Sequence, residues 1–383
     1  MAQAKLNIGL IGTGFMGKAH ALAWRNVWPV FGATLGEVPW VTLAMLCETP
    51  LERARQMGRE FGFDRVTDDW RALVADPGVD VVSITTPNGL HREMAEAALA
   101  AGKHVWCEKP MALTLADAQA MADAAVAAGR STMVGYNYTR NPAHTHACRL
   151  VAEGAIGRPV HFRGWVDEDY QANPDLPWTW RATLAQAGLG ALGDLGCHLV
   201  SLAHGLMGPI DSLQADLQII HETRPMPEGG GRGRVENEDA ASALVRFVSG
   251  ARGSMVVSRS AWGRKSRLGY EVHGTEGMII FDQERMNELQ IYRNRGPVSE
   301  QGFTTVLTGP AHPPFGRFCP APGHQLGFND LKVIECADFL RRIAGQAAPG
   351  PDFTEALEIE RVIHAMAASA AGDGRRIAVA AFR

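Results

Sequence analysis

The feature that most constrains the fold is a glycine-rich turn near the N-terminus, Gly12-x-Gly14-x-x-Gly17. An apolar run, Leu6–Ile11, precedes this turn, and a helical pattern follows it. Gly12 permits a tight turn, Gly14 lets the backbone approach a pyrophosphate, and Gly17 lets the helix pack close to the strand. The start of that helix offers free N–H groups and positive partial charge to phosphates. The turn therefore predicts a dinucleotide site, whose expected contacts are Gly12, Gly14, Phe15, Met16 and Gly17.

The first 135 residues alternate apolar runs with helical patterns. Near-continuous apolar strands separated by helices are typical of a parallel sheet that is covered on both faces. We therefore expect an α/β Rossmann domain over residues 1–135. The expected strands are Leu6–Ile11, Val41–Cys47, Val79–Thr85, His104–Cys107 and Thr132–Val134, and the expected helices are Phe15–Val27, Pro50–Phe61, Trp70–Ala75, His91–Ala101 and Leu115–Ala128.

Beyond about residue 150, strand-like runs follow one another with short turns between them. This pattern predicts an antiparallel meander, so we expect an α+β domain over residues 136–383 with an open, predominantly antiparallel sheet. Two helices close the chain, and the last is free to pack back on the first domain. The segment Pro225–Val235 is expected to be a mobile surface loop. The expected strands are Val160–Asp167, Ser212–His221, Ala241–Val248, Gly253–Ser258, Leu268–Val272, Met278–Asp282 and Glu288–Tyr292, followed by helices Leu331–Ile343 and Thr354–Ala370.

Composition narrows the classes of function. A net charge of −4 supplies no basic stripe, so no nucleic-acid partner is expected. The most apolar stretch, Gly188–Gly208, carries Asp194, His198 and His204, so no membrane span is expected. The six cysteines are scattered without a C-x-x-C pair, which is typical of reduced thiols in a cytoplasmic protein.

Glu48 follows the second expected strand and is the expected acidic ligand of the cofactor ribose. It lies 31 residues past Gly17, where about 20 is usual, and the extra length falls in Val27–Trp40, which we expect to be an inserted loop. A carboxylate here can accept from both ribose hydroxyls and would repel a 2′-phosphate, so NAD is favoured over NADP. The alternatives are a surface carboxylate, or NADP bound with the help of Arg53 or Arg55.

Polar residues end the third and fourth expected strands, as Thr86-Pro87-Asn88 and Glu108-Lys109-Pro110. Ligands of open α/β sheets bind at the carboxyl ends of the strands. A lysine that leaves an apolar strand is often only a solvated strand end, but this place favours a role for Lys109. The predicted cofactor contacts here are Thr86, Pro87, Asn88, His91, Glu108 and Lys109.

Asp194 and His198 are four residues apart in a glycine-rich apolar segment, so on a helix they share one face. Glycines around them would let a ligand approach the backbone closely. The alternatives are a local salt bridge, a core histidine, or a metal site, for which His144 and His146 are weak further ligands. We expect no metal.

The glycine turn, the Glu-Lys-Pro strand end and Gly193-Asp194-Leu195-Gly196-Cys197-His198 together resemble the Gfo/Idh/MocA oxidoreductase family, which includes inositol dehydrogenases and glucose–fructose oxidoreductase. The resemblance covers nearly the whole chain, including Gly135-Tyr136-Asn137-Tyr138 and the turn Gly274-Thr275-Glu276-Gly277. It implies a Rossmann domain followed by an open sheet that carries the substrate and often packs subunits together.

The resemblance also implies that Lys109, Asp194 and His198 are the catalytic residues. Glu48 stands where many members have aspartate, which keeps the carboxylate. The insertion Val27–Trp40 and the segment 174–181 depart from shorter members.

Oxidation of a secondary alcohol fits these three side chains. A neutral histidine, with an ordinary pKa near 6.5, can remove the hydroxyl proton. The ammonium group of Lys109 can stabilise developing alkoxide charge. Asp194 can accept from a neighbouring hydroxyl and orient His198. Lys109 and His198 could exchange roles as the direct base.

Aromatic and amide side chains supply further candidates. A loop that contains two tryptophans and an arginine suits a sugar ring or the nicotinamide end of the cofactor, although loop packing explains the tryptophans equally well. The predicted substrate contacts are Asn137, Tyr138, Trp178, Trp180 and Arg181.

These observations predict an NAD-dependent oxidoreductase that oxidises a ring hydroxyl of a cyclitol or sugar, such as an inositol, aldose, glycoside or anhydrosugar. The alternatives are a redox-neutral glycosidase that uses bound NAD and a non-catalytic NAD-binding sensor. Because an open sheet face must be covered, we expect a homodimer or homotetramer.

Overall fold

The computed structural model describes residues 5–382. By its internal contacts the chain divides into two compact units. Of the described residues, the first unit contains 5–140 together with 326–358, and the second contains 141–325 together with 359–382. The two units are described separately below. The division into domains at residue 135, expected from the sequence as 1–135 and 136–383, stays a prediction.

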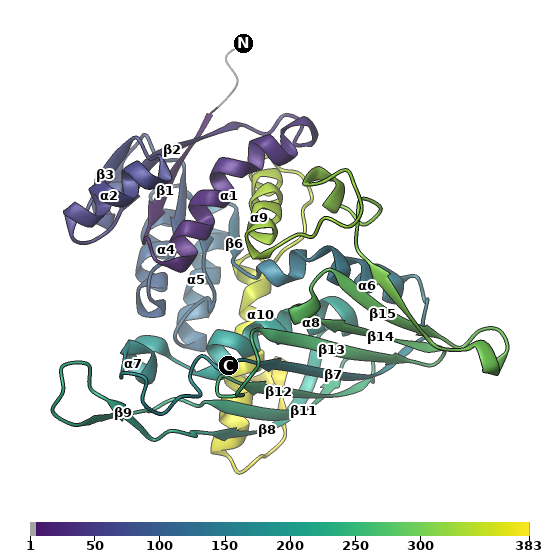
Figure 1. Ribbon diagram of the computed structural model, residues 1–383. Helices are drawn as coiled ribbons and strands as arrows, with labels where there is room; N and C mark the ends of the chain where they lie inside the picture. Colours follow the sequence, from purple (N-terminus) through teal and green to yellow (C-terminus); the bar gives the residue numbers. More distant parts are fainter. Residues whose placement is uncertain (1–4, 383) are drawn as a thin grey trace. The chain divides into compact units, whose positions relative to one another are not determined.

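The first unit is built on a six-stranded sheet, whose strands have the order β3-β2-β1-β4-β5-β6 and pair only in parallel (Figure 1). Helix α1 contacts α2 and α9, whereas α4 contacts α3 and α5. The predicted Rossmann architecture is therefore confirmed. The strands are β1 (Lys5–Ile11), β2 (Trp40–Cys47), β3 (Arg65–Thr67), β4 (Val81–Ile84), β5 (His104–Cys107) and β6 (Thr132–Val134), and the helices are α1 (Phe15–Phe31), α2 (Leu51–Phe61), α3 (Trp70–Ala75), α4 (His91–Ala100), α5 (Leu115–Ala128) and α9 (Phe328–Ile343).

The prediction of an inserted loop over Val27–Trp40 is wrong for its first half. Helix α1 continues to Phe31, and a short 3-10 turn, Gly32–Thr34, follows it. Pro29 lies in the last turn of α1, where its missing N–H costs one backbone hydrogen bond. Val27 and Phe31 are fully buried, so packing of this last turn outweighs the local preference of proline.

The second unit contains a nine-stranded mixed sheet of order β16-β15-β14-β13-β7-β12-β11-β8-β17. All neighbours pair antiparallel except β7 and β12, which are parallel. The open, mostly antiparallel sheet is confirmed, but a pure meander is wrong because β7 lies between β12 and β13. The strands are β7 (Pro159–Asp167), β8 (Ile210–Gln218), β11 (Ala240–Phe247), β12 (Arg252–Ser258), β13 (Arg267–Gly274), β14 (Gly277–Asp282), β15 (Glu288–Arg293), β16 (Phe303–Leu307) and β17 (Ile377–Ala378).

Helices cover one face of this sheet. Helix α6 (Pro142–Ala152) contacts β14 and β15. Helix α8 (Cys197–Met207) contacts β7 and β13. Burial alternates along β11, so every second side chain points away from these helices. Leu244 and Val256 are exposed on that other face. The last helix, α10 (Phe353–Ala371), begins in the first unit and continues into the second.

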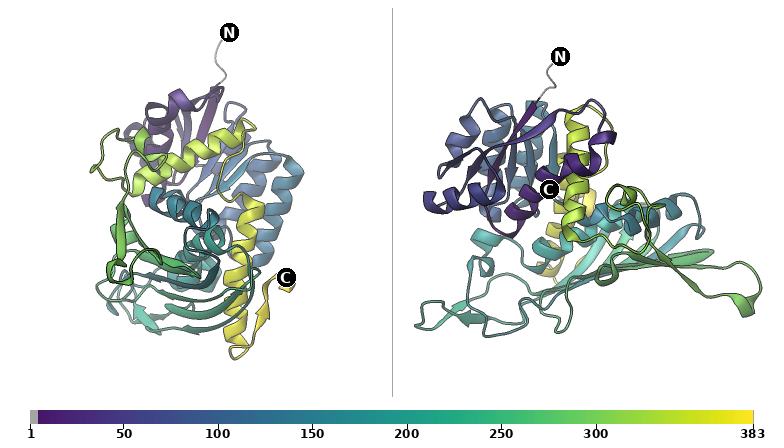
Figure 2. Two further views of the ribbon diagram at one scale, coloured as in Figure 1. Left: turned by 90° about the vertical axis from the view of Figure 1, so that its right-hand side faces the viewer. Right: turned by 45° about the horizontal axis from the view of Figure 1, so that its top comes forward.

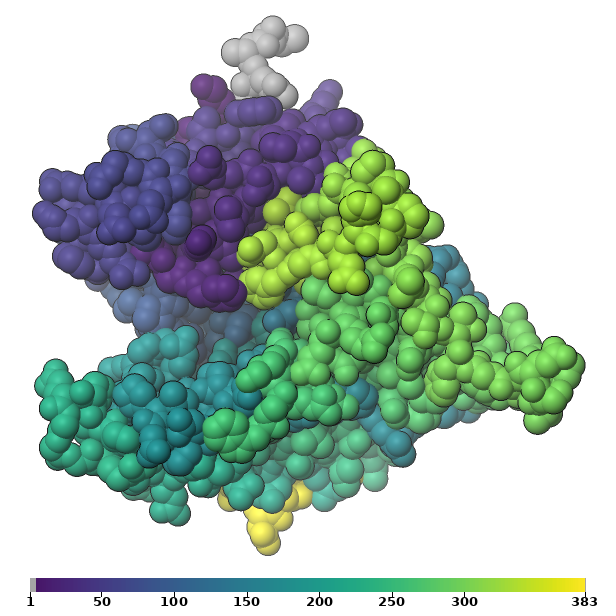
Figure 3. All heavy atoms as spheres, in the orientation of Figure 1, coloured from purple at the N-terminus to yellow at the C-terminus, as the bar shows by residue number. Residues whose placement is uncertain are grey.

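Two strand pairs extend from the second unit. The hairpin β15–β16 reaches beyond the rest of the sheet in the right-hand view of Figure 2. The strands β9 (Thr223–Pro225) and β10 (Arg232–Arg234) form a separate antiparallel ribbon, and both pairs protrude in Figure 3. The segment Pro225–Val235, expected to be a mobile surface loop, therefore takes part in strand pairing at Pro225 and at Arg232–Arg234, and its mobility stays a prediction. Within residues 5–382, no helix has the length and apolar character needed to cross a bilayer.

Candidate active site

The glycine turn joins β1 to α1 in the first unit as predicted. A Cβ at Gly17 would lie 2.3 Å from the carbonyl oxygen of Gly12, so the close approach of helix and turn requires glycine there. A Cβ at Gly14 would meet nothing within 4 Å, which leaves open space above the helix start. Gly14 is the N-cap of α1 and offers no side chain to cap it. The turn therefore presents uncapped N–H groups to a phosphate.

Glu48 lies directly beside this turn. Its carboxylate accepts hydrogen bonds from the Thr13 N–H at 2.8 Å and from the Thr13 hydroxyl. Arg53 Nε lies 3.7 Å from the same carboxylate and donates to the Thr13 hydroxyl at 3.2 Å. Arg55 pairs instead with Glu52. The carboxylate thus stands at the glycine turn, where a ribose-binding acid is expected, and one of the two candidate arginines is paired with it.

His91 connects the ends of two strands. Its Nδ1 lies 3.0 Å from the carbonyl oxygen of Pro110, and its Nε2 lies 3.0 Å from that of Thr86. The ring is fully buried, and this burial lowers the pKa of His91. These contacts tie the segment after β5 to the segment after β4, whereas a direct contact of His91 with the cofactor stays a prediction.

Lys109 follows β5 and is half-buried. The preceding Glu108 is buried, and its carboxylate faces into the unit. Oε1 of Glu108 lies 2.9 Å from His20 Nε2 and 2.5 Å from Lys332 Nζ, while Oε2 accepts from the Lys109 N–H at 3.3 Å. The ammonium of Lys332 holds the pKa of Glu108 well below its ordinary value, against the opposing effect of burial. The predicted contact of Glu108 with the cofactor stays a prediction.

The second unit positions Asp194 and His198 on consecutive helical turns. Asp194 lies in a π-helical turn, Leu192–Gly196, which leads directly into α8, where His198 is buried. The Tyr170 hydroxyl donates to Asp194 Oδ2 at 2.6 Å. Burial raises the pKa of Tyr170 well above its ordinary value, so the hydroxyl stays protonated and donates.

The glycine-rich segment before Asp194 is fixed by the residues that precede β11. The Leu192 N–H donates to Glu238 Oε1 at 2.8 Å. A Cβ at Gly190 would lie 2.0 Å from the carbonyl oxygen of Glu238, so only glycine fits this approach. Asp239 is buried and pairs with Arg259 at 2.8 Å. Gly190 therefore allows this segment to pack closely on Glu238.

The predicted substrate residues fall in both units. Asn137 and Tyr138 lie in a 3-10 turn after β6, and the Tyr138 ring contacts Phe328. Trp178 Nε1 donates to the carbonyl oxygen of Arg234 at 2.9 Å, which fits loop packing on β10. Trp180 is half-buried, and the exposed Arg181 guanidinium lies 4.4 Å from its ring centroid. Roles of these residues in substrate binding stay predictions.

Among residues 5–382, no group of three or more His, Cys, Asp or Glu side chains has a metal-binding arrangement. His144, weighed above as a metal ligand, lies 3.0 Å from the Tyr270 hydroxyl.

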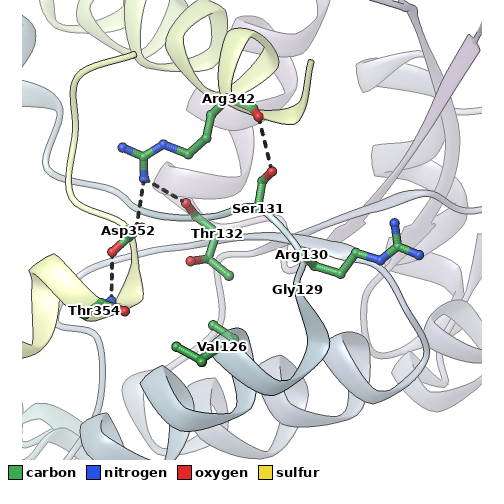
Figure 4. A pocket seen from close by; sticks show the side chains of 9 residues that line it. Val126, Gly129, Arg130, Ser131, Thr132, Arg342, Asp352 and Thr354 are labelled. Atoms are coloured by element: carbon green, nitrogen blue, oxygen red, sulfur yellow. Dashed lines mark hydrogen bonds and ion pairs between the residues drawn. The ribbon is translucent and has the colours of Figure 1, made fainter. Parts of the chain in front are cut away.

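A separate pocket of the first unit is lined by residues of α5, its C-terminal turn and the 342–354 segment, among them Arg130, Arg342 and Asp352 (Figure 4). No predicted site residue lines this pocket.

Three residues of these sites were missed from the sequence. Tyr170 lies in an irregular segment after β7 and carries no pattern that would mark it. Glu238 likewise gives no sequence signal. Lys332 did have a sequence signal, because Lys332 and Glu335 are charged residues three apart within the apolar pattern of α9. Both side chains are fully buried in the structure.

Two family models match the chain. The oxidoreductase family with an NAD-binding Rossmann fold matches residues 6–136, and the GFO/IDH/MocA C-terminal domain matches residues 144–280. Levoglucosan dehydrogenase of Pseudarthrobacter phenanthrenivorans is 39% identical over 378 residues, which cover 96% of each chain. The scyllo-inositol 2-dehydrogenase (NAD(+)) of Bacillus subtilis is 29% identical over 76% of this chain and 78% of its own.

Solved structures agree with the sequence matches. A levoglucosan dehydrogenase in complex with NADH and levoglucosan superimposes with a TM-score of 0.93 and 39% identity, covering 98% of this chain and 99% of the other. The full-length similarity and both domain matches lead to one assignment. The chain belongs to the Gfo/Idh/MocA oxidoreductase family, with an NAD-binding Rossmann domain at its N-terminus.

Proposed function

We propose that this protein is an NAD-dependent dehydrogenase that oxidises a ring hydroxyl of a sugar or cyclitol, and that an anhydrosugar of the levoglucosan type is its substrate. The observation that carries this proposal is the similarity to levoglucosan dehydrogenase over both units, at 39% identity and 98% coverage. Inositol, aldose and glycoside substrates are the alternatives within the same reaction class.

The cofactor assignment is supported by the first unit. The open space at Gly14 and the uncapped start of α1 suit a pyrophosphate. Glu48 supplies the acid that favours two free ribose hydroxyls over a 2′-phosphate. NAD, when bound, supplies the hydride acceptor of the reaction.

We assign the chemistry to Lys109, Asp194 and His198. His198 takes the hydroxyl proton, and the Lys109 ammonium stabilises the developing alkoxide. Asp194 accepts from a neighbouring hydroxyl of the substrate, while the Tyr170 hydroxyl fixes its Oδ2. In an equivalent assignment, Lys109 is the direct base and His198 the stabilising donor. The proposed sugar contacts are Asn137, Tyr138, Trp178, Trp180 and Arg181.

The proposal includes self-association and a cytoplasmic location. Leu244 is 60% exposed and Val256 45% exposed on the uncovered face of the large sheet, which suits burial in a homodimer or homotetramer. All six cysteines are free thiols, as is usual in a reducing compartment. Light scattering at micromolar concentration should give a multiple of the chain mass, and a monomer would contradict the assembly.

A cofactor-reduction assay tests the function. The purified protein is mixed with NAD or NADP and with levoglucosan, an inositol, an aldose or a glycoside, and absorbance of the reduced nicotinamide is followed. We expect reduction with NAD and levoglucosan. Reduction of NAD with another sugar or cyclitol would replace the proposed substrate but keep the proposed reaction class. No reduction across the panel by protein that binds NAD would contradict the dehydrogenase and favour the glycosidase or the sensor.

A further inference from the structure

Four titratable side chains form a buried cluster directly behind the Lys109 strand end, all within the first unit. Lys332 Nζ lies 2.5 Å from Glu108 Oε1 and 2.7 Å from Glu335 Oε2. His20 Nε2 lies 2.9 Å from Glu108 Oε1. Because a carboxylate only accepts, Nε2 of His20 carries the proton and donates. None of the four side chains is more than 5% exposed.

The cluster is poorly suited to stabilise the fold by itself. The attraction within a buried ion pair offsets the cost of desolvation only when every polar atom has a good hydrogen-bond partner. Replacing such a pair with apolar side chains often leaves the stability of the fold unchanged or raises it. Within residues 5–382, His20 Nδ1 and Glu335 Oε1 are buried without a hydrogen-bond partner. Burial raises the pKa of Glu335 and lowers that of His20 to about 4. The cluster is therefore a weaker source of net stability than an apolar core of the same volume would be.

Glu108 connects the cluster to the proposed catalytic lysine. Its two carboxylate oxygens face in different directions, since Oε1 meets Lys332 and His20 while Oε2 accepts from the Lys109 backbone N–H at 3.3 Å. The ammonium of Lys332 also lies 5.4 Å from the Trp106 ring centroid, one residue before Cys107 at the end of β5.

Gly135 closes the cluster from the neighbouring strand end. Its N–H donates to the carbonyl oxygen of Cys107 at 2.9 Å. A Cβ at this position would lie 2.3 Å from Glu108 Oε1 and 2.8 Å from Lys332 Nζ. The glycine of the Gly-Tyr-Asn-Tyr motif thus leaves the space in which the Glu108–Lys332 pair forms.

We propose that Lys332 is a positioning residue for the oxidation. By pairing with Glu108 it fixes the carboxylate that binds the Lys109 N–H, and so fixes the point from which the Lys109 side chain reaches the substrate. This inference rests on the proposed function of Lys109. It assigns a role in the reaction to α9, a helix more than 200 residues away from Lys109 along the chain.

The test compares two buried lysines at opposite ends of β5. Lys332→Met removes the ammonium behind Lys109, whereas Lys103→Met removes an ammonium that donates to Asp76 and Val79 carbonyl oxygens before β5 begins. We expect Lys332→Met to lower kcat roughly 10- to 100-fold at saturating NAD and sugar, because a small misplacement of a reacting group costs that much. Lys103→Met should lower thermal stability while its kcat stays within about twofold of wild type.

A double-mutant cycle shows whether Lys332 acts through Glu108. If it does, Glu108→Gln/Lys332→Met has about the kcat of Glu108→Gln alone, and NAD affinity measured by fluorescence titration changes less than about threefold. Lys332→Met with a kcat within about twofold of wild type overturns the inference, whatever its melting temperature. The inference is also overturned if the two substitutions lower kcat independently, so that the reduction in the double variant is the product of the two single reductions.

Two further variants keep the test decisive. If Lys332→Met does not fold, Gly135→Ala displaces the pair without removing a charge, and an unchanged kcat in this variant overturns the inference. Lys109→Ala separates the inference from the proposed function. If Lys109→Ala keeps normal turnover, the proposed site is wrong and the inference falls with it. If Lys109→Ala is inactive but Lys332→Met is not impaired, only the inference fails.

Discussion

The two units hold their proposed catalytic groups by different means. In the first unit, the Lys109 backbone is held by Glu108, whose carboxylate belongs to a buried cluster of charged groups. In the second, Asp194 is held by the neutral Tyr170 hydroxyl, on a segment packed against Glu238. Removing one partner of a buried ion pair is more costly than removing a neutral hydroxyl donor. The positioning of Lys109 should therefore be more sensitive to the loss of its partner than the positioning of Asp194 is to the loss of Tyr170.

The largest expected effect is the loss of the Lys332 ammonium. Lys332→Met leaves Glu108 as a buried carboxylate without its cation, which should lower the free energy of unfolding by about 3–5 kcal/mol. Urea denaturation followed by tryptophan fluorescence measures this change. The paired variant Glu108→Gln/Lys332→Met should recover much of the loss. A single variant as stable as the wild type would show that the cluster does not carry an ionised pair.

The same cluster should make the protein sensitive to mild acid. Burial lowers the pKa of His20 from 6.5 to about 4, so below pH 6.5 the unfolded chain takes up a proton that the folded chain does not. Stability is then full above pH 6.5 and falls by about 3 kcal/mol as the pH approaches 4. His20→Gln can still donate to Glu108 but does not titrate. Its loss of stability between pH 6.5 and 4 should be smaller, and an equal loss would contradict the assignment.

A glycine substitution tests the close packing in the second unit. Gly190→Ala places a Cβ against the Glu238 carbonyl oxygen, and the forced backbone shift should cost about 1–3 kcal/mol of stability. Gly302→Ala is the matched control, because a Cβ there meets nothing within 4 Å. Differential scanning calorimetry should show a lower melting temperature for Gly190→Ala only. Equal melting temperatures would mean that the segment before Asp194 adapts freely.

The smallest expected effect on stability is the loss of the Tyr170 hydroxyl. Tyr170→Phe should cost about 1 kcal/mol, as should Tyr292→Phe, whose hydroxyl donates to Gln301 on the distant hairpin. Only Tyr170→Phe should also lower kcat, by about tenfold, because it releases one oxygen of Asp194. If both variants keep wild-type kcat, Tyr170 does not orient a catalytic carboxylate.

The sequence allowed the elements and the glycine turn to be predicted because their signals are local. Apolar runs and helix ends depend on neighbouring residues, so the strand His104–Cys107 and the helix Leu115–Ala128 were predicted with their observed bounds. Thr114 caps that helix by accepting from the Asp117 N–H, a local contact between residues three apart. The extension of α1 through Pro29 was missed because packing of distant residues outweighs the local preference.

The surroundings of the proposed site could not be predicted in the same way. The partner of the Glu108 carboxylate gave no local signal, because Lys332 is 224 residues away in the chain. Tyr170 comes to Asp194 from a segment without regular structure. The residues proposed to carry the chemistry were marked by motifs. The residues that contact them depend on tertiary pairing, which a single sequence does not reveal.

The most direct test of the central claim is the reduction of NAD by levoglucosan, compared between the wild type, Lys109→Ala and His198→Ala. Stopped-flow absorbance of the reduced nicotinamide would be followed with enzyme in excess over substrate, so that binding and product release do not limit the signal. We predict a fast single-turnover rise in the wild type and a rate lower by about 10²–10⁴-fold in each variant, as expected for groups that accept a proton or stabilise the alkoxide. Near-normal rates in both variants would contradict the proposed site and, with it, the mechanism.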